Sequence, residues 1–211
     1  MKKSLYLIGA GDLGREMESW LILLPNFHHN WEIKGYLDQN PGALNTYPSE
    51  YIIIDDPLMF KFNHNDYVLV CLTKPDQKQN LIEKIKDKVK FFSYIAPNAT
   101  LGKYVNLGTG IVICPNTCIS TNVTIGDFVF INAGTQIGHD CKIGAFSSLM
   151  AHVDLGGKVK IGERVFMGTN STIIPGLTIN DDITIGTGSI VIRDLKKPGT
   201  YFGNPATFLG F

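Results

Sequence analysis

The stretch INAGTQIGHDCKIGAFSSLMAHVDLGGKVKIG, residues 131–162, is built from hexads. Each hexad begins with an aliphatic residue, which glycine often follows, and a small or β-branched residue stands four places after the aliphatic one. The pattern extends in both directions without a phase slip. It covers seventeen first positions, all aliphatic or methionine: Ile95, Leu101, Leu107, Ile113, Ile119, Ile125, Ile131, Ile137, Ile143, Leu149, Leu155, Ile161, Met167, Ile173, Ile179, Ile185 and Val191.

A period of six predicts a solenoid of short strands joined by tight corners, the hexapeptide β-helix. We expect the first residue of each hexad to point into the core, and the fifth, such as Val123 or Ser171, to share the narrow interior. Glycine in the second place relieves crowding where the backbone turns. Three hexads form one triangular coil, so the repeat predicts between five and six coils. Because such a prism is nearly flat-sided, we expect small-molecule sites between neighbouring copies.

The residues before the repeat predict an α/β domain. Apolar runs indicate strands over 4–8, 32–38, 51–55 and 67–72. Helical patterns run from the glycine-rich turn after the first strand to about Leu24, and over 76–89. Alternation of strands and helices is typical of a parallel sheet.

Gly9, Gly11 and Gly14 form a G-x-G-x-x-G turn between the first strand and the first helix. This placement is typical of phosphate binding, because a helix N-terminus offers free N–H groups and a positive dipole end. Asp38 ends the second strand, where an acid can bond a ribose hydroxyl. A plain tight turn is the alternative. A dinucleotide fold needs two such halves, and only about ninety residues precede the solenoid, so one nucleotide fits better than the cofactor of a dehydrogenase.

Composition narrows the class of partner. Nineteen basic residues balance nineteen acidic ones in this chain of 211 residues, so charge favours neither nucleic acid nor an anionic membrane. No stretch approaches the roughly 18 apolar residues that span a bilayer. The four cysteines, Cys71, Cys114, Cys118 and Cys141, complete no zinc spacing, and we expect them to be reduced and buried in a cytoplasmic protein without a metal cofactor.

A resemblance to a known family rests on four segments: LIGAGDLGRE (7–16), GYLD (35–38), INAGTQIGHDCKIG (131–144) and GNPA (203–206). Together they resemble the sialic acid and nucleotide-amino-sugar acetyltransferases, which join a half-Rossmann domain to a left-handed β-helix of hexapeptide repeats. The resemblance implies a Rossmann-like nucleotide-sugar-binding domain over 1–92. It further implies a left-handed β-helix acyltransferase domain with a C-terminal tail over 93–211, and a homotrimer with its active sites between subunits.

His139 and Asp140 occupy the third and fourth places of the hexad that begins at Ile137, where side chains face outward. By resemblance, His139 is the general base, which removes a proton from a sugar amine or hydroxyl as that group attacks the thioester carbon. Asp140 would stabilise the imidazolium. Adjacent strand residues point to opposite faces, so direct pairing depends on the local corner. An exposed histidine without a catalytic role is the alternative.

The resemblance also implies binding residues for two ligands. For the nucleotide sugar they are Gly9, Gly11, Asp12 and Leu13 around the phosphates, Asp38 and Gln39 near the base or ribose, and Thr73 and Lys74 at the sugar or a phosphate. For acetyl-CoA they are Ser148, Thr169 and Thr187. Ser148 stands where the family often has a second histidine. His152, four residues later, is either an ordinary corner residue or a replacement for that ring.

The implied function is acetyl-CoA-dependent N-acetylation of a nucleotide-linked amino-deoxy sugar, such as a 4-amino-4,6-dideoxyhexose, in lipopolysaccharide or O-antigen synthesis. The alternative is O-acetylation of sialic acid or a related sugar. A zinc enzyme of the carbonic-anhydrase type would need two histidines five residues apart, which the chain lacks. A non-catalytic scaffold would leave the nucleotide-binding turn unexplained. The nucleotide base stays open among uracil, thymine, guanine and cytosine.

Overall fold

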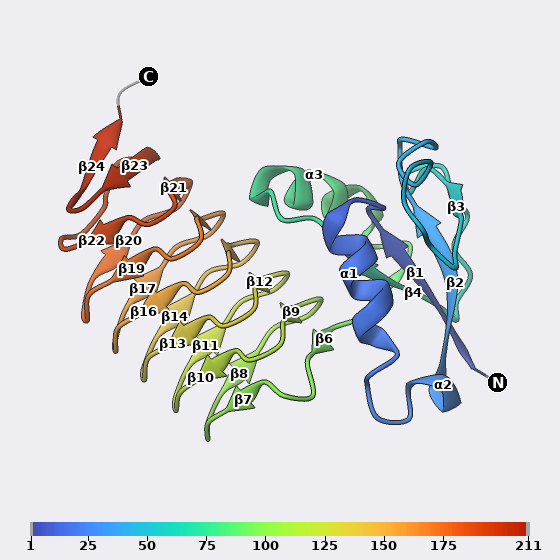
Figure 1. Ribbon diagram of the computed structural model, residues 1–211, viewed down its shortest axis with the longest axis horizontal. Coiled ribbons are helices and arrows are strands. Elements are labelled where there is room, and N and C mark those ends of the chain that lie inside the picture. The colour runs from blue at the N-terminus through green and yellow to red at the C-terminus, as the bar shows by residue number, and fades with distance from the viewer. Residues whose placement is uncertain (1, 210–211) are drawn as a thin grey trace.

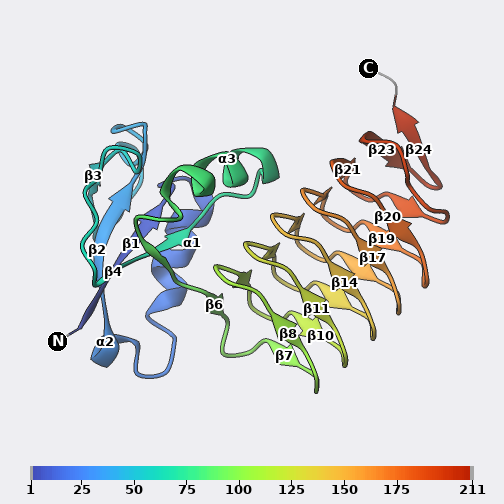
Figure 2. The same ribbon diagram turned by 180° about the vertical axis from the view of Figure 1, so that it is seen from behind.

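The protein, described here by a computed structural model over residues 2–209, consists of an α/β part and a parallel β-helix that lie side by side (Figures 1 and 2). The α/β part comes first in the chain, and the β-helix then extends away from it toward the C-terminus. None of the helices within residues 2–209 combines the length and apolar character that crossing a membrane requires.

The α/β part is a five-stranded parallel sheet in the order β3-β2-β1-β4-β5. Helix α1 packs against Leu5 and Leu7 on one face, and α3 packs against Tyr6 and Ile8 on the other, as the alternation of strand side chains requires. The elements are β1 (Lys3–Ile8), α1 (Asp12–Leu21), α2 (Phe27–Asn30), β2 (Trp31–Leu37), β3 (Ile53–Asp55), β4 (Asp66–Val70), α3 (Pro75–Ile85) and β5 (Lys90–Phe91).

The predicted strands and helices of this part are confirmed in type, and their ends differ by a few residues. Helix α1 ends at Leu21 instead of about Leu24, and α3 ends at Ile85, before the predicted end at residue 89. The short elements α2 and β5 were not predicted, because four and two residues carry no readable periodicity.

The hexads form a parallel β-helix, as predicted. Each of the seventeen strands ends on the aliphatic residue of its hexad. They are β6 (Tyr94–Ile95), β7 (Thr100–Leu101), β8 (Asn106–Leu107), β9 (Val112–Ile113), β10 (Cys118–Ile119), β11 (Thr124–Ile125), β12 (Phe130–Ile131), β13 (Gln136–Ile137), β14 (Lys142–Ile143), β15 (Ser148–Leu149), β16 (Asp154–Leu155), β17 (Lys160–Ile161), β18 (Phe166–Met167), β19 (Thr172–Ile173), β20 (Thr178–Ile179), β21 (Ile183–Ile185) and β22 (Ile190–Val191).

These strands stack into three flat sheets, which we call the first, second and third face. The first face contains β6, β9, β12, β15, β18 and β21, the second runs from β7 through β13 to β22, and the third from β8 through β14 to β20. Residues 18 apart lie in register, so that Ile119 pairs with Ile137 and Ile137 with Leu155. Each side chain therefore stacks on the equivalent one in the neighbouring coil.

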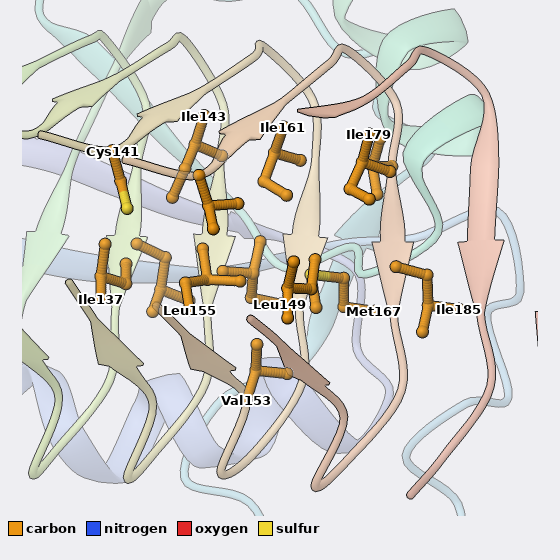
Figure 3. Close-up of a cluster of buried hydrophobic side chains, with 14 of the residues drawn as sticks. Ile137, Cys141, Ile143, Leu149, Val153, Leu155, Ile161, Met167, Ile179 and Ile185 are labelled. Carbon is orange, nitrogen blue, oxygen red and sulfur yellow. The ribbon is translucent and has the colours of Figure 1, made fainter. Parts of the chain in front are cut away.

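The interior of the prism is filled by the predicted residues. Figure 3 shows Ile143, Leu149 and Leu155 pointing into it, and the fifth-place residues Val123 and Val159 are fully buried beside them. The fourth residue of fifteen consecutive hexads, from Tyr104 to Gly188, has a positive φ. The left-handed conformation therefore makes these fifteen corners, and it decides where side chains next to them point.

The α/β part covers the first face of the β-helix at the N-terminal coils, where β6, β9 and β12 lie. Tyr94, Val112 and Phe130 point outward from this face, yet they are buried in one cluster with Leu13 and Met17 of α1. Their burial joins the two parts into a continuous apolar contact.

A two-stranded hairpin closes the far end of the prism. It consists of β23 (Gly199–Gly203) and β24 (Ala206–Leu209), and β23 pairs with β21 in parallel. Tyr201 and Ala206 join the solenoid core. All four cysteines carry free thiols, and Cys71, Cys114 and Cys141 are buried as expected, whereas Cys118 is half-buried.

Candidate active site

The corner between β13 and β14 brings His139 and Asp140 together. Asp140 has a φ of 62°, and this left-handed turn replaces the alternation of a regular strand. As a result the two side chains meet, with Nδ1 of His139 2.7 Å from Oδ2 of Asp140. A carboxylate only accepts hydrogen bonds, so Nδ1 is the nitrogen that carries the proton in the neutral imidazole, and Nε2 then has the lone pair. The His139 side chain is 55% exposed, so a substrate can approach the ring.

Asn122, in the preceding coil, holds Asp140 from a second side. Its Nδ2 donates to Oδ1 of Asp140 over 2.6 Å. The Asn122 amide and, second, the hydrogen bond with His139 hold the pKa of Asp140 below its ordinary value. The carboxylate is therefore ionised at neutral pH and has both oxygens engaged.

The glycine-rich turn has the geometry that its sequence predicted. Gly9 has a φ of 98°, which favours glycine. A Cβ on Gly14 would collide with the backbone oxygen of Gly9, so only glycine lets α1 pack this closely. A Cβ on Gly11, the N-cap of α1, would meet no described atom within 4 Å. The space before the first N–H groups of α1 is thus open to an anion.

Asp38 fastens this turn to the end of β2. Its Oδ2 accepts the N–H of Ala10 over 2.7 Å, and its Oδ1 accepts that of Asn40 over 2.8 Å. Each carboxylate oxygen keeps a further lone pair, so a ligand hydroxyl can still bind. The structure therefore adds a supporting role to the ribose contact expected of Asp38.

Two neighbouring cavities lie around the turn and share Leu72 and Gln77 in their linings. The sheet cavity has a volume of about 380 Å³ and is lined by Ile8, Gly9, Leu37, Asp38, Gln39, Pro57, Leu58, Leu72, Gln77, Asn80, Leu81 and Lys84. The junction cleft has a volume of about 370 Å³ and is lined by Asp12, Leu13, Glu16, Cys71, Leu72, Thr73, Lys74, Gln77, Phe130, Asn132 and Met150. The cleft therefore lies where the α/β part meets the first face of the β-helix.

The predicted nucleotide-sugar residues gather around these two cavities. Three of them line the sheet cavity: Gly9, Asp38 and Gln39. Four line the junction cleft: Asp12, Leu13, Thr73 and Lys74. Gly11 is in the lining of neither cavity.

The junction cleft also contains residues that were not predicted. Asn132 and Met150 occupy the second place of stacked hexads, where the repeat usually has glycine, and that departure is a sequence signal. Glu16 lies on the first helix, and burial, followed by the charge of Asp12, raises the pKa of its carboxyl group. No sequence pattern distinguishes Glu16 from other acidic residues on a helix surface.

Ser148 does not occupy the exposed position that a direct contact with acetyl-CoA needs. It is fully buried on the first face, and its hydroxyl accepts a hydrogen bond from Nζ of Lys78 over 3.0 Å. Lys78 comes from α3, is 2% exposed, and also approaches the backbone oxygen of Ser147. Burial lowers the pKa of Lys78 to about 7. The expected acetyl-CoA contact of Ser148 is thus replaced by an interdomain contact.

The other acetyl-CoA candidates lie on the corner that follows the first face. Thr169 and Thr187 are stacked there at the third place of their hexads. Thr169 is half-buried, and Thr187 is exposed. His152 lies on the same corner, exposed, with its ring over Gly134 of the coil below. We call this corner, between the first and second faces, the first ridge. Toward the N-terminal coils, the first ridge continues to Asn132 and Met150, which line the junction cleft.

His139 lies on a different corner. The turn between β13 and β14 joins the second face to the third, and we call this corner the second ridge. The full width of the second face separates it from the first ridge. Within one chain, therefore, the His139–Asp140 pair and the junction cleft do not meet. Among residues 2–209, no group of three or more His, Cys, Asp or Glu side chains could hold a metal ion.

Comparison with known proteins adds three findings. Residues 158–193 match a family model described as the hexapeptide repeat of succinyl-transferase. No curated protein matches the sequence. Among solved structures, the chain is similar to a variant of perosamine N-acetyltransferase from Caulobacter crescentus in complex with CoA and GDP-perosamine. The two are 27% identical, the similarity covers 99% of this chain and 97% of that chain, and the TM-score is 0.87.

Two more distant structures share the fold. The acetyltransferase domain of PglB from Neisseria gonorrhoeae FA1090 is 23% identical, with coverage of 99% of this chain and 100% of that one and a TM-score of 0.87. WeeI from Acinetobacter baumannii AYE is 20% identical, with coverage of 97% and 99% and a TM-score of 0.71.

The repeat and these neighbours support a left-handed β-helix and identify the chain as an acyltransferase, as predicted. Both parts of the chain are included in the similarity, because it covers nearly the whole length of each structure.

Proposed function

We propose that this protein is an acetyl-CoA-dependent N-acetyltransferase that acts on the amino group of a nucleotide-linked amino-deoxy sugar, such as a 4-amino-4,6-dideoxyhexose. The observation that carries the proposal is the division of the site. A glycine-rich turn lies on the α/β part, with one cavity in that part and one at its junction with the β-helix, and an outward histidine with its carboxylate lies on a different corner of the β-helix. The similar enzyme from Caulobacter crescentus was solved with CoA and GDP-perosamine, which supports both ligand classes.

The nucleotide sugar would bind across the two cavities. Its diphosphate would face the N-terminus of α1 at Gly11, where free N–H groups and open space meet. The base and ribose would occupy the sheet cavity near Asp38 and Gln39. The sugar would then extend into the junction cleft, toward Thr73 and Lys74. This direction brings the sugar to the foot of the first ridge.

The base would come from a neighbouring copy. In a homotrimer of parallel prisms, the second ridge of one subunit can lie beside the first ridge of the next, which would bring His139 to the junction cleft that it does not reach within its own chain. Acetyl-CoA would run in the groove between these ridges, past Thr169 and Thr187. Backbone N–H groups there could polarise the thioester carbonyl.

The chemistry follows from the tautomer of His139. Its Nε2 accepts a proton from the sugar amine as the amine nitrogen attacks the thioester carbon. The new C–N bond forms, the C–S bond breaks, and the thiolate of CoA takes up the proton from the imidazolium. Asp140 stabilises the imidazolium through its 2.7 Å hydrogen bond while the proton resides there. The products are the N-acetylated sugar and CoA thiol.

A substrate panel tests this function. Nucleotide 4-amino sugars carrying uracil, thymine, guanine or cytosine are each mixed with acetyl-CoA, and thiol release is measured alongside matched hydroxyl sugars and free sialic acid. We expect turnover with an amino sugar and a loss of about 10²- to 10⁴-fold in His139→Ala. Turnover with the hydroxyl sugars alone would contradict N-acetylation, and normal turnover of His139→Ala would contradict the assignment of the base.

A further inference from the structure

On the second ridge, the residue that stacks on His139 in the next coil is unusual. Gly157 lies one coil further along at the same third place of the hexad. From Pro97 to Thr187, sixteen hexads have a third residue, and Gly157 is the only glycine among them. Gly157 does not have a positive φ, so its backbone does not require glycine.

The space above Gly157 is occupied by the imidazole. A Cβ built on Gly157 would lie 2.5 Å from Nε2, 2.8 Å from Cε1 and 3.0 Å from Cδ2 of His139. The ring therefore lies across the Cα of Gly157, and any larger residue would displace it. A backbone hydrogen bond between the two coils holds this arrangement. The N–H of Lys158, which follows Gly157, donates to the carbonyl oxygen of His139 over 2.7 Å.

On the opposite side, Asn122 fixes the carboxylate that orients the ring. Asn122 and Asp140 both occupy the fourth place of their hexads, with φ values of 58° and 62°. The amide group of Asn122 reaches Oδ1 of Asp140, which leaves Oδ2 to face Nδ1 of His139. Asn122, Asp140 and His139 thus form a chain of two hydrogen bonds along the ridge, and neither end residue is free to turn alone.

We propose that Asn122 and Gly157 are positioning residues for the general base, Asn122 by fixing the Asp140 carboxylate and Gly157 by leaving the space in which the ring lies. This inference rests on the proposed function, in which His139 is the base. Asn122 keeps the proton on Nδ1, and Gly157 sets the direction in which Nε2 presents its lone pair across the subunit boundary. A base misplaced by about 1 Å loses on the order of 10²-fold in rate.

Asn122→Gly tests the first residue without straining the corner, because glycine adopts the left-handed conformation freely. Asn116→Gly is the matched control. Asn116 occupies the same place of its hexad with a φ of 60°, and it accepts an equivalent amide hydrogen bond from Asn98 over 2.9 Å. We expect Asn122→Gly to lower kcat about tenfold with KM nearly unchanged. Asn116→Gly should leave both kcat and KM unchanged.

Gly157→Ala tests the second residue. Alanine is already the third residue of three hexads, at Ala133, Ala145 and Ala151, so the corner accepts it. The three atoms nearest to the new methyl group all belong to the movable ring, so we expect an unchanged melting temperature and a kcat about 10- to 100-fold lower.

A spectroscopic readout distinguishes positioning from a general structural effect. ¹⁵N NMR of histidine-labelled trimer reports which ring nitrogen of His139 carries the proton. We expect Nδ1 in the parent protein and in Asn116→Gly, and a mixture of tautomers in Asn122→Gly. Parent-like kcat and tautomer in Asn122→Gly, or an equal loss of kcat in Asn116→Gly, would overturn the role of Asn122. Parent-like kcat in Gly157→Ala would overturn that of Gly157. If His139→Ala itself kept normal turnover, the proposed function would fail as well, which separates the two failures.

Discussion

The α/β part and the β-helix present their candidate site residues on surfaces of opposite shape. Two cavities of about 370 to 380 Å³ lie near the glycine-rich turn, the sheet cavity in the α/β part and the junction cleft between that part and the β-helix, but the His139–Asp140 pair lies outside both. The β-helix presents that pair on a stiff, exposed ridge. The residues to which we assign recognition therefore line concave surfaces between elements, whereas the proposed base lies on a convex corner. A convex site is useful only against another surface, which is why the proposal needs a second copy.

The largest expected effect separates chemistry from recognition. His139→Ala should lower kcat by about 10²- to 10⁴-fold, because it removes the base, while the dissociation constant for the nucleotide sugar stays within about twofold. Isothermal titration with the nucleotide sugar and a thiol-release assay provide the two numbers. A large loss of nucleotide-sugar affinity would place His139 in recognition instead of catalysis.

At Gly11 we expect the opposite result, weaker recognition of the nucleotide sugar while the base stays intact. A Cβ there meets no described atom, so Gly11→Val should fold normally and fill the space that we assign to the diphosphate. We expect KM for the nucleotide sugar to rise at least about tenfold with a smaller change in KM for acetyl-CoA.

Gly14→Ala is the contrasting variant on the same turn. Its Cβ would collide with the backbone oxygen of Gly9, so we expect loss of stability instead of a selective rise in KM. Thermal denaturation and steady-state kinetics distinguish the two outcomes. A parent-like KM in a folded Gly11→Val protein would show that the phosphates bind elsewhere.

A smaller effect is expected at the contact between the two parts. Lys78 binds a proton less readily when folded, since burial lowers its pKa to about 7, whereas an exposed lysine titrates near about 10.4. Between these pH values the unfolded chain binds more protons, so the free energy of unfolding should rise with pH, by about 2–4 kcal/mol.

Lys78→Met should remove most of this rise, which urea denaturation at pH 7 and pH 9.5 measures. Lys86→Met, at an exposed lysine just after α3, is the control and should keep it. An equal pH dependence in the parent and in Lys78→Met would mean that Lys78 is not buried at the contact.

The sequence predicted the β-helix almost completely, because a hexad repeats one local rule. Ile137, Ile143 and Leu149 point inward for the same reason, and each strand ends where the pattern places its aliphatic residue. The glycine-rich turn was predictable for a related reason, since Gly9 has a positive φ and a Cβ on Gly14 would collide with the backbone oxygen of Gly9.

The features that sequence reasoning missed depend on contacts between distant residues. Ser148 is buried because Lys78, 70 residues earlier, reaches it from α3. Asp140 pairs with His139 because the fourth place of the hexad is left-handed, which a count of residue types does not give. Glu16 enters the junction cleft only because α1 packs on the first face.

The central claim, a site shared between copies, is tested most directly by mixed trimers. His139→Ala and Gly11→Val chains are co-expressed in equal amounts, and mixed trimers are purified by two different tags. Turnover is measured at a nucleotide-sugar concentration below the parent KM, where each variant alone keeps at most about a tenth of the parent activity. If the cleft of one subunit uses the base of its neighbour, each mixed trimer has one site of three that pairs the intact cleft with the intact base, so mixed trimers should recover about a third of the parent activity. If the cleft and the base act within one chain, every site keeps one defect, and the mixed trimers should remain as inactive as the two single variants.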